Sequence, residues 1–102
     1  MRHAYTSLSA IAVYRQNLKL RCPRCRKTVV FSGPQLWWLF QRRRWQDRLL
    51  DVADRLYCRT CWGADARKHR PAITVTREDP AETGLPWPEE REWKRLVARY
   101  RT

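Results

Sequence analysis

The last part of the chain shows the clearest repeat of apolar and polar positions. Apolar side chains recur there at i, i+3, i+4 and i+7, which places them on one face of a helix. These positions are Trp93, Leu96, Val97 and Tyr100. Glutamates lie near the start of this segment and arginines near its end, as the helix dipole favours. We therefore predict a C-terminal helix over residues 89–101, preceded by a proline-containing linker over residues 77–88.

Shorter apolar runs predict strands. Residues 28–31 are β-branched and aromatic, and residues 18–21 precede them across a short cysteine turn, so the two runs predict a β-hairpin. Residues 72–76, Ala-Ile-Thr-Val-Thr, are the clearest strand of the chain. Residues 7–15 fit either a short helix or a strand. In the helix, Leu8, Ile11 and Ala12 would share one face.

The middle of the chain, residues 34–56, has the spacing of helices. Ser32 with a glutamine three residues later has the capping-box pattern, which predicts a helix over residues 36–43. Asp47 is a suitable cap for a second helix over residues 48–56. One long helix fits as well, but two are favoured because residues 45–47 interrupt the apolar spacing.

All four cysteines lie in two Cys-x-x-Cys pairs, Cys22 with Cys25 and Cys58 with Cys61. Each pair can present two thiolates from one tight turn, and two such turns complete a tetrahedral site for one metal ion. The gap between the pairs exceeds the usual spacing of about 15 to 20 residues because the helical segment is inserted there. Zinc is the expected metal. With 43% hydrophobic and 31% charged residues, we expect the ion to be a condition of folding.

Three alternatives to a zinc site are disfavoured. Iron in a rubredoxin-like site uses the same ligands, but a basic helical insert is untypical of such proteins. A redox dithiol of thioredoxin type needs one exposed pair at the start of a helix. Disulfides are untypical of the reducing cytoplasm, which is the expected location because the chain shows no strong export signal and no membrane span. Four sulfur ligands leave no position for a water, so we expect neither catalysis nor a small-molecule substrate.

The net charge is +12, and its distribution is uneven. Residues 1–46 contain ten basic residues and no acidic one, whereas the remainder is nearly balanced. This asymmetry favours a polyanionic partner, with nucleic acid first and an anionic membrane surface second. The candidate phosphate contacts surround the first cysteine pair or end the first helix of the insert. They are Arg21, Arg24, Arg26, Lys27, Arg42, Arg43 and Arg44.

The chain has six tryptophans. Three lie in the insert, where they either pack the core or present aromatic surface for base stacking. We expect two of these three, Trp37, Trp38 and Trp45, to be core and one to be exposed. Trp87 and Trp93 are expected to dock the C-terminal helix, and Trp62 to cover the metal sulfurs.

The cysteine turns resemble those of zinc-ribbon proteins. The likeness rests on Cys22-Pro23-Arg24-Cys25 and on Cys58-Arg59-Thr60-Cys61 with Gly63, a glycine suited to the backbone reversal of a metal knuckle. The chain also looks like short ribbon proteins of alphaproteobacteria, in which a helical segment leads into an Arg-Leu-aromatic-Cys turn, here residues 55–58. The likeness covers residues 18–76. It departs from the family in the long insert and in Arg26-Lys27, where a glycine often follows the first pair. It implies nucleic-acid binding, a role in transcription or translation, or the joining of proteins.

Together these observations predict one α+β domain over residues 1–102. It would be a small zinc-ribbon-like domain over residues 18–76, with two knuckles, a helical insert at 34–56 and a C-terminal helix. The expected function is non-catalytic binding of DNA or RNA with one structural Zn²⁺. The alternative is a zinc-stabilised adaptor that docks on a larger assembly through its Trp/Arg-rich insert or its C-terminal helix.

Overall fold

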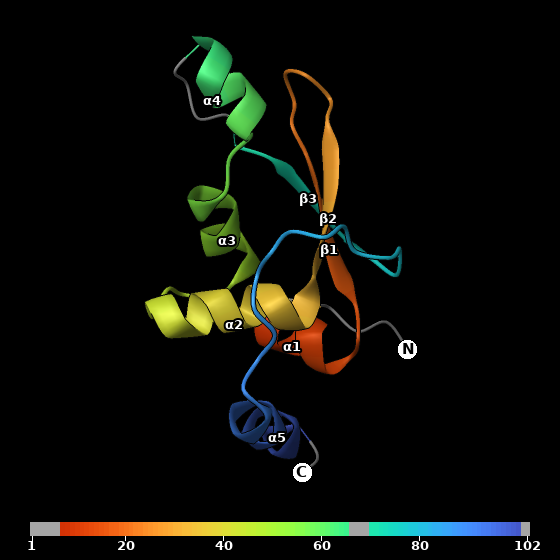
Figure 1. The fold of residues 1–102 in the computed structure, drawn as a ribbon, viewed down its shortest axis with the longest axis vertical. Helices are drawn as coiled ribbons and strands as arrows, with labels where there is room; N and C mark the ends of the chain where they lie inside the picture. Colours follow the sequence, from red (N-terminus) through yellow and green to blue (C-terminus); the bar gives the residue numbers. More distant parts are fainter. Residues whose placement is uncertain (1–6, 66–69, 101–102) are drawn as a thin grey trace.

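The computed structural model describes residues 7–65 and 70–100. Its elements, in chain order, are α1 (Leu8–Val13), β1 (Asn17–Arg21), β2 (Thr28–Ser32), α2 (Gly33–Arg43), α3 (Leu49–Arg55), α4 (Arg59–Asp65), β3 (Ala72–Thr76) and α5 (Glu90–Arg99). Figure 1 shows a small sheet with α1 and α2 at its base, α4 beside the free end of the β1–β2 hairpin, and α5 at the opposite end of the molecule. The mixture of helices and strands confirms the α+β class.

The sheet is antiparallel throughout, with strand order β2-β1-β3. In the register of the sheet, Leu18 of β1 pairs with Phe31 of β2 and with Val75 of β3. Two residues further along β1, Leu20 pairs with Val29 and with Ile73. Because side chains two residues apart share a face, these apolar residues line one face, and Lys19 and Arg21 belong to the other. The predicted hairpin and the predicted strand at 72–76 are confirmed.

The N-terminal segment is a helix, which decides between the two alternatives left by its sequence. The Ser7 hydroxyl accepts a hydrogen bond from the Ala10 N–H at 3.3 Å and caps α1. The side chains of Leu8, Ile11 and Ala12 are buried, as the helical reading requires.

Asp47 caps a different helix from the one its sequence neighbours suggest. Its carboxylate accepts a hydrogen bond from the Ser9 N–H at 3.1 Å, and its carbonyl oxygen accepts one from the Leu8 N–H at 2.8 Å. Helix α3 instead has Arg48 at its N-cap, and the Arg48 side chain makes no capping hydrogen bond. The prediction that Asp47 caps the second insert helix is therefore wrong, because the amides of α1 compete for its oxygens.

The insert contains two helices, as favoured. The Ser32 hydroxyl accepts a hydrogen bond from the Gln35 N–H at 3.3 Å, so the serine half of the capping box is present. The Gln35 side chain donates to the Leu85 carbonyl at 2.6 Å instead of returning to Ser32. Helix α2 ends where Arg44 adopts a left-handed conformation with φ 56°. Gly33 lies so close to Gln16 that an added Cβ would be 2.3 Å from its carbonyl oxygen, which leaves no room for a side chain.

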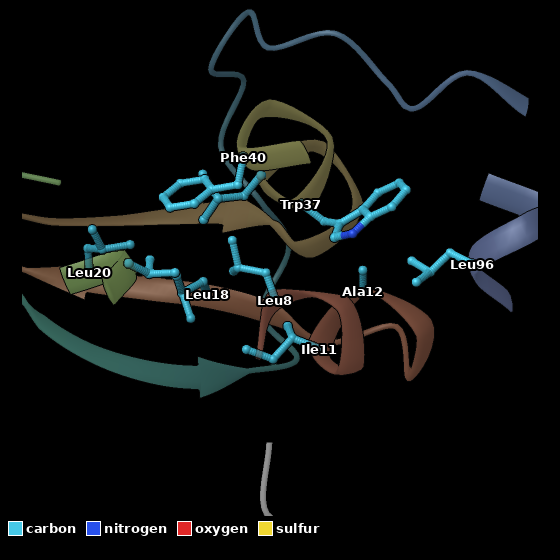
Figure 2. Packing of buried hydrophobic residues seen from close by; sticks show 10 residues of the cluster. Leu8, Ile11, Ala12, Leu18, Leu20, Trp37, Phe40 and Leu96 are labelled. Atoms are coloured by element: carbon cyan, nitrogen blue, oxygen red, sulfur yellow. The ribbon is translucent and has the colours of Figure 1, made fainter. Parts of the chain in front are cut away.

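The core fills the space between α1, α2 and the apolar face of the sheet (Figure 2). Its buried members are Leu8, Ile11, Ala12, Leu18, Leu20, Leu36, Trp37, Phe40, Val52 and Leu96. Of the insert tryptophans, Trp37 is buried, whereas Trp38 and Trp45 are half-buried against the core. Trp93 of α5 meets Trp37 with ring centroids 6.1 Å apart, so it docks the C-terminal helix as expected. Trp87 is 64% exposed, which departs from its expected docking role.

The segment before α5, residues 77–89, contains neither helix nor strand. It is nevertheless fastened to the sheet and to α2. The Ala81 N–H donates to the Val30 carbonyl at 2.9 Å, and the Asn17 side-chain amide donates to the Glu78 carbonyl at 2.8 Å. Helix α5 follows within the predicted bounds, except that residue 101 lies outside the described part of the chain.

Candidate metal centre

The first cysteine pair lies in the turn of the β1–β2 hairpin. The Cys22 N–H donates to the Lys27 carbonyl at 2.9 Å, and the Arg26 N–H donates to the Cys22 carbonyl at 2.9 Å. These bonds close the turn, and Arg26 adopts a left-handed conformation with φ 62° to complete it. The hairpin therefore holds Cys22 and Cys25 on one tight turn, as their spacing predicts.

The second pair is carried by a helix. Cys58 directly precedes α4 and Cys61 lies in its first turn, and the Trp62 N–H donates to the Cys58 carbonyl at 3.0 Å. Residues three apart on a helix lie on the same face, so this turn also brings two sulfurs together. Gly63 lies inside α4 and makes no backbone reversal, so the expectation that it serves a knuckle turn is wrong.

The two pairs converge on one point. The four sulfurs of Cys22, Cys25, Cys58 and Cys61 all lie within 4.8 Å of one another. The Cys22 and Cys61 sulfurs are 3.5 Å apart, and the Cys25 and Cys58 sulfurs are 3.6 Å apart. A disulfide would need about 2.05 Å. A tetrahedron of sulfurs around zinc, with Zn–S bonds of about 2.3 Å, has edges of about 3.8 Å. The cluster therefore fits a four-coordinate metal ion.

Burial differs across this cluster. Cys22 and Cys61 are 3% and 2% exposed, whereas Cys25 is exposed and Cys58 is half-buried. The cluster thus has an inner side that packs toward the protein and an outer side that faces solvent. A divalent ion at its centre would be shielded on one side only.

The protonation of the sulfurs is set by two opposing effects. The backbone N–H of Cys25, followed by that of Arg24, favours the Cys22 thiolate and lowers the pKa of Cys22 to about 7. The backbone N–H of Cys61 likewise lowers the pKa of Cys58. Burial and the crowding of the other sulfurs raise the pKa of Cys61 to about 12. Thiolates at both turns are thus supported by N–H groups, and a central cation would offset the repulsion among the four sulfurs.

The predicted basic residues fall into two separate groups. Arg21, Arg24, Arg26 and Lys27 are exposed on and beside the turn of the hairpin. The residues 42–44 are also exposed, but the C-terminal end of α2 lies well away from that turn (Figure 1). The structure therefore does not bring the seven candidate phosphate contacts into one patch.

The group on the insert is arranged around indole rings. The Arg42 guanidinium lies 5.6 Å from the ring centroid of Trp38, and that of Arg43 lies 5.8 Å from the ring centroid of Trp45. Arg55, which sequence reasoning did not select, lies 4.7 Å from the ring centroid of Trp45. Arg42 and Arg43 are close in sequence to the tryptophans that they contact, so the sequence could have indicated these two contacts. Arg55 belongs to α3, and only the packing of α3 brings it to Trp45.

A hollow of about 310 Å³ lies on the outer face of the sheet, and sequence reasoning missed it. Its lining residues are Lys19, Arg21, Thr28, Thr74, Thr76 and Glu78. Lys19 donates to the Glu78 carboxylate at 2.9 Å, and this contact, together with the Thr76 hydroxyl, holds the pKa of Glu78 below its usual value. The alternation of apolar and threonine residues over 72–76 predicts that the threonines share one face of the strand. The sequence does not predict that β3 lies next to β1, which brings these threonines beside Lys19 and Arg21.

Comparisons with known proteins do not extend this description: no family model, no curated protein and no solved structure matches the chain. Within residues 7–65 and 70–100, no helix has both the length and the apolar character needed to cross a membrane.

Proposed function

We propose that this chain is a non-catalytic nucleic-acid-binding protein of zinc-ribbon type. The observation that carries the proposal is the exposure of Arg24, Arg26 and Lys27 on the turn that also supplies two of the clustered sulfurs. A backbone of fixed shape avoids the backbone part of the ordering cost when its basic side chains contact phosphates. The proposed target is DNA or RNA, in transcription or translation.

The proposed metal is one zinc ion on Cys22, Cys25, Cys58 and Cys61. When bound, it supplies charge neutralisation and a cross-link and takes no part in a reaction, because four protein ligands fill a tetrahedral ion. It would join the hairpin turn to α4. Elemental analysis is expected to give one zinc per chain, whereas a red protein would indicate iron.

The hollow on the sheet supports an extension of this surface. Threonine hydroxyls and Lys or Arg side chains are common contacts to phosphates and sugars, and Arg21 lines the hollow and also ends β1 beside the cysteine turn. A bound strand would run from the turn along the outer face of β1. Glu78 occupies the far side of the hollow, so a phosphate there would compete with its carboxylate for Lys19.

The proposal is tested by fluorescence anisotropy with labelled DNA and RNA, using the zinc-loaded protein at low and at physiological salt. Replacement of Arg24, Arg26 and Lys27 by glutamine should weaken binding and lower the slope of log K against log salt by about two to three. The matched control replaces Arg42, Arg43 and Arg44, which removes the same charge from the other group. Absence of binding at physiological salt by the unaltered protein, or equal losses in both variants, would overturn the proposal.

A second candidate function is an adaptor for an acidic protein surface. It is supported by the guanidinium groups of Arg42, Arg43 and Arg55, which are stacked on the indoles of the insert. Arginine and tryptophan are the residues most often found at energetic centres of interfaces. A complex that survives nuclease treatment and is lost when these three arginines are replaced would favour this function over the first.

A further inference from the structure

A groove lies where the end of α1, the start of α2 and the segment that leads into α5 meet. Its volume is about 550 Å³, and proline and tryptophan side chains form much of its walls. These wall residues are Pro34, Pro80, Trp87, Pro88 and Trp93. Sites of about 300–1,000 Å³ enclose whole organic ligands, so the groove has room for an aromatic side chain.

Trp87 lines this groove without filling it. Its side chain is 64% exposed, so the indole stands at the edge of the groove and faces solvent. The backbone beside it is held in place, because the Gln35 side chain donates to the Leu85 carbonyl at 2.6 Å and prolines precede and follow the tryptophan. A large aromatic side chain on a restricted backbone loses little freedom on binding, which suits it as the centre of an interface.

The charge in the groove is set by Arg15. Its side chain lines the groove, is exposed and makes no ion pair within residues 7–65 and 70–100. The carboxylate on the opposite wall, that of Glu90, is instead 3.0 Å from the Lys94 ammonium group. An occupant of the groove should therefore bring an apolar group for the walls and a carboxylate for Arg15.

The chain itself carries a segment with both properties. Residues 78–92 contain six acidic residues and one basic residue, a net charge of −5 in a chain of net charge +12. Within this segment Glu89 follows Trp87 by two residues, is exposed and makes no ion pair in the described part of the chain. Two strongly basic copies would meet with least repulsion where their acidic residues are concentrated.

The groove, Trp87 and Glu89 lie close together on one molecule, so the patch can be complementary to itself. In a two-fold contact, each residue of the patch meets its counterpart's partner on the other copy. The turn with Arg24, Arg26 and Lys27 lies at the opposite end of the molecule from α5, so its positive charge stays away from such a contact (Figure 1).

We propose that this patch joins two copies of the chain, with Trp87 of each copy in the groove of the other and Glu89 of each copy opposite Arg15 of the other. The inference goes beyond the proposed function and requires no nucleic acid.

The test is sedimentation equilibrium of the zinc-loaded, nuclease-treated protein under reducing conditions, at physiological salt and from about 1 µM to about 1 mM protein. The unaltered chain should pass from one chain to two as its concentration rises. Trp87→Ala should raise the dimer dissociation constant by about 30-fold or more, because it removes the central aromatic side chain from both copies. Leu50→Ala is the matched control, since Leu50 is 81% exposed on α3 and does not line the groove, and it should leave the constant unchanged.

Charge reversal tests the pairing of Arg15 with Glu89. Arg15→Glu and Glu89→Arg should each weaken the dimer by about 10-fold or more, because each places like charges opposite one another twice in the interface. The two substitutions in one chain should restore most of the affinity, since opposite charges then face each other again. A merely structural role of either residue would not produce this recovery, and thermal unfolding of each variant shows that the fold is kept. A single chain at every concentration, a dimer unaffected by Trp87→Ala, or no recovery in the double variant would overturn the inference.

Discussion

Among residues 7–65 and 70–100, three arginines adopt the left-handed backbone conformation that glycine adopts at least cost. Arg15, Arg26 and Arg44 have φ values of 58°, 62° and 56°. A residue with a Cβ pays about 1–2 kcal/mol for this conformation. Arg44 ends α2, and Arg26 closes the cysteine turn, where glycine would relieve the strain. Backbone strain is concentrated at functional sites, so the left-handed conformation of Arg26 is consistent with the proposed phosphate contact of its side chain.

Arg26→Gly should therefore separate stability from function. We expect the free energy of unfolding of the zinc-loaded protein to stay the same or rise by up to about 1 kcal/mol, because glycine adopts this conformation without a clash. Nucleic-acid affinity should fall, and the salt slope should decrease by about 0.7 to 0.9 because one phosphate contact is lost. Urea unfolding and anisotropy titrations measure the two effects.

Arg44→Gly is the control for this substitution, since it removes the same charge at the same backbone conformation on the other basic group. Its stability should change in the same direction, whereas its nucleic-acid affinity should stay close to that of the unaltered protein. Equal losses of affinity in both variants would show that net charge alone attracts the ligand.

At the scale of elements, local patterns were sufficient where neighbours in sequence decide the structure. The period of the apolar residues identified α5, and the β-branched run identified β2. The spacing within Cys22–Cys25 predicted a turn that presents two sulfurs. The meeting of all four sulfurs was predicted from the coordination chemistry of two such pairs and not from neighbours in sequence. Ser32 capped α2 as its pattern indicates, because its partner is only three residues away.

Local patterns failed where the partner is distant in sequence. The Asp47 carboxylate could accept a hydrogen bond from an N–H group of α1 or of α3. It accepts one from Ser9 of α1, because the fold brings that residue within reach. Gly63 suits a reversal, but the backbone continues as helix α4. The exposure of Trp62 and the separation of the two basic groups depend on how the elements pack, which the order of residues along one segment does not encode.

Asp47→Ala tests the assignment of this residue to α1. The Ser9 N–H would lose its acceptor, and the loss of a helix cap costs about 0.5–2 kcal/mol in the free energy of unfolding. Urea unfolding measures this cost. Amide hydrogen exchange should show faster exchange at Ser9 and Ala10, and unchanged exchange at Val52 in α3.

Asp51→Ala provides the matched control, since it removes an aspartate whose exposed ion pair with Arg48 spans 2.9 Å. Such surface pairs contribute about 0–1 kcal/mol, so its effect should be smaller than that of Asp47→Ala. Faster exchange in α3 than in α1 for the Asp47 variant would contradict the assignment.

At the scale of the whole molecule, the hydrophobic core and the cysteine cluster lie in different places. The molecule extends 46 Å along its longest axis, with α4 and the hairpin turn toward one end and α5 at the other (Figure 1). The core lies between α1, α2 and the sheet, and α4 contributes only Cys61 to the buried apolar residues of the described chain. The core has no need of α4, so metal loss should act locally.

Removal of the metal by a chelator under reducing conditions should therefore loosen the structure only at the end of the protein that contains the hairpin turn and α4. Amide protection is expected to fall at residues 22–27 and 58–65, which carry the four sulfurs, and to persist in α1 and α2. Hydrogen exchange resolved by residue measures this, and nucleic-acid affinity should fall in parallel because the basic turn loses its fixed shape. Cys61→Ser should reproduce the effect without a chelator. Loss of protection throughout α1 and α2 would contradict this expectation. It would show that the ion is a condition of folding for the whole chain, as the modest hydrophobic content of the sequence suggests.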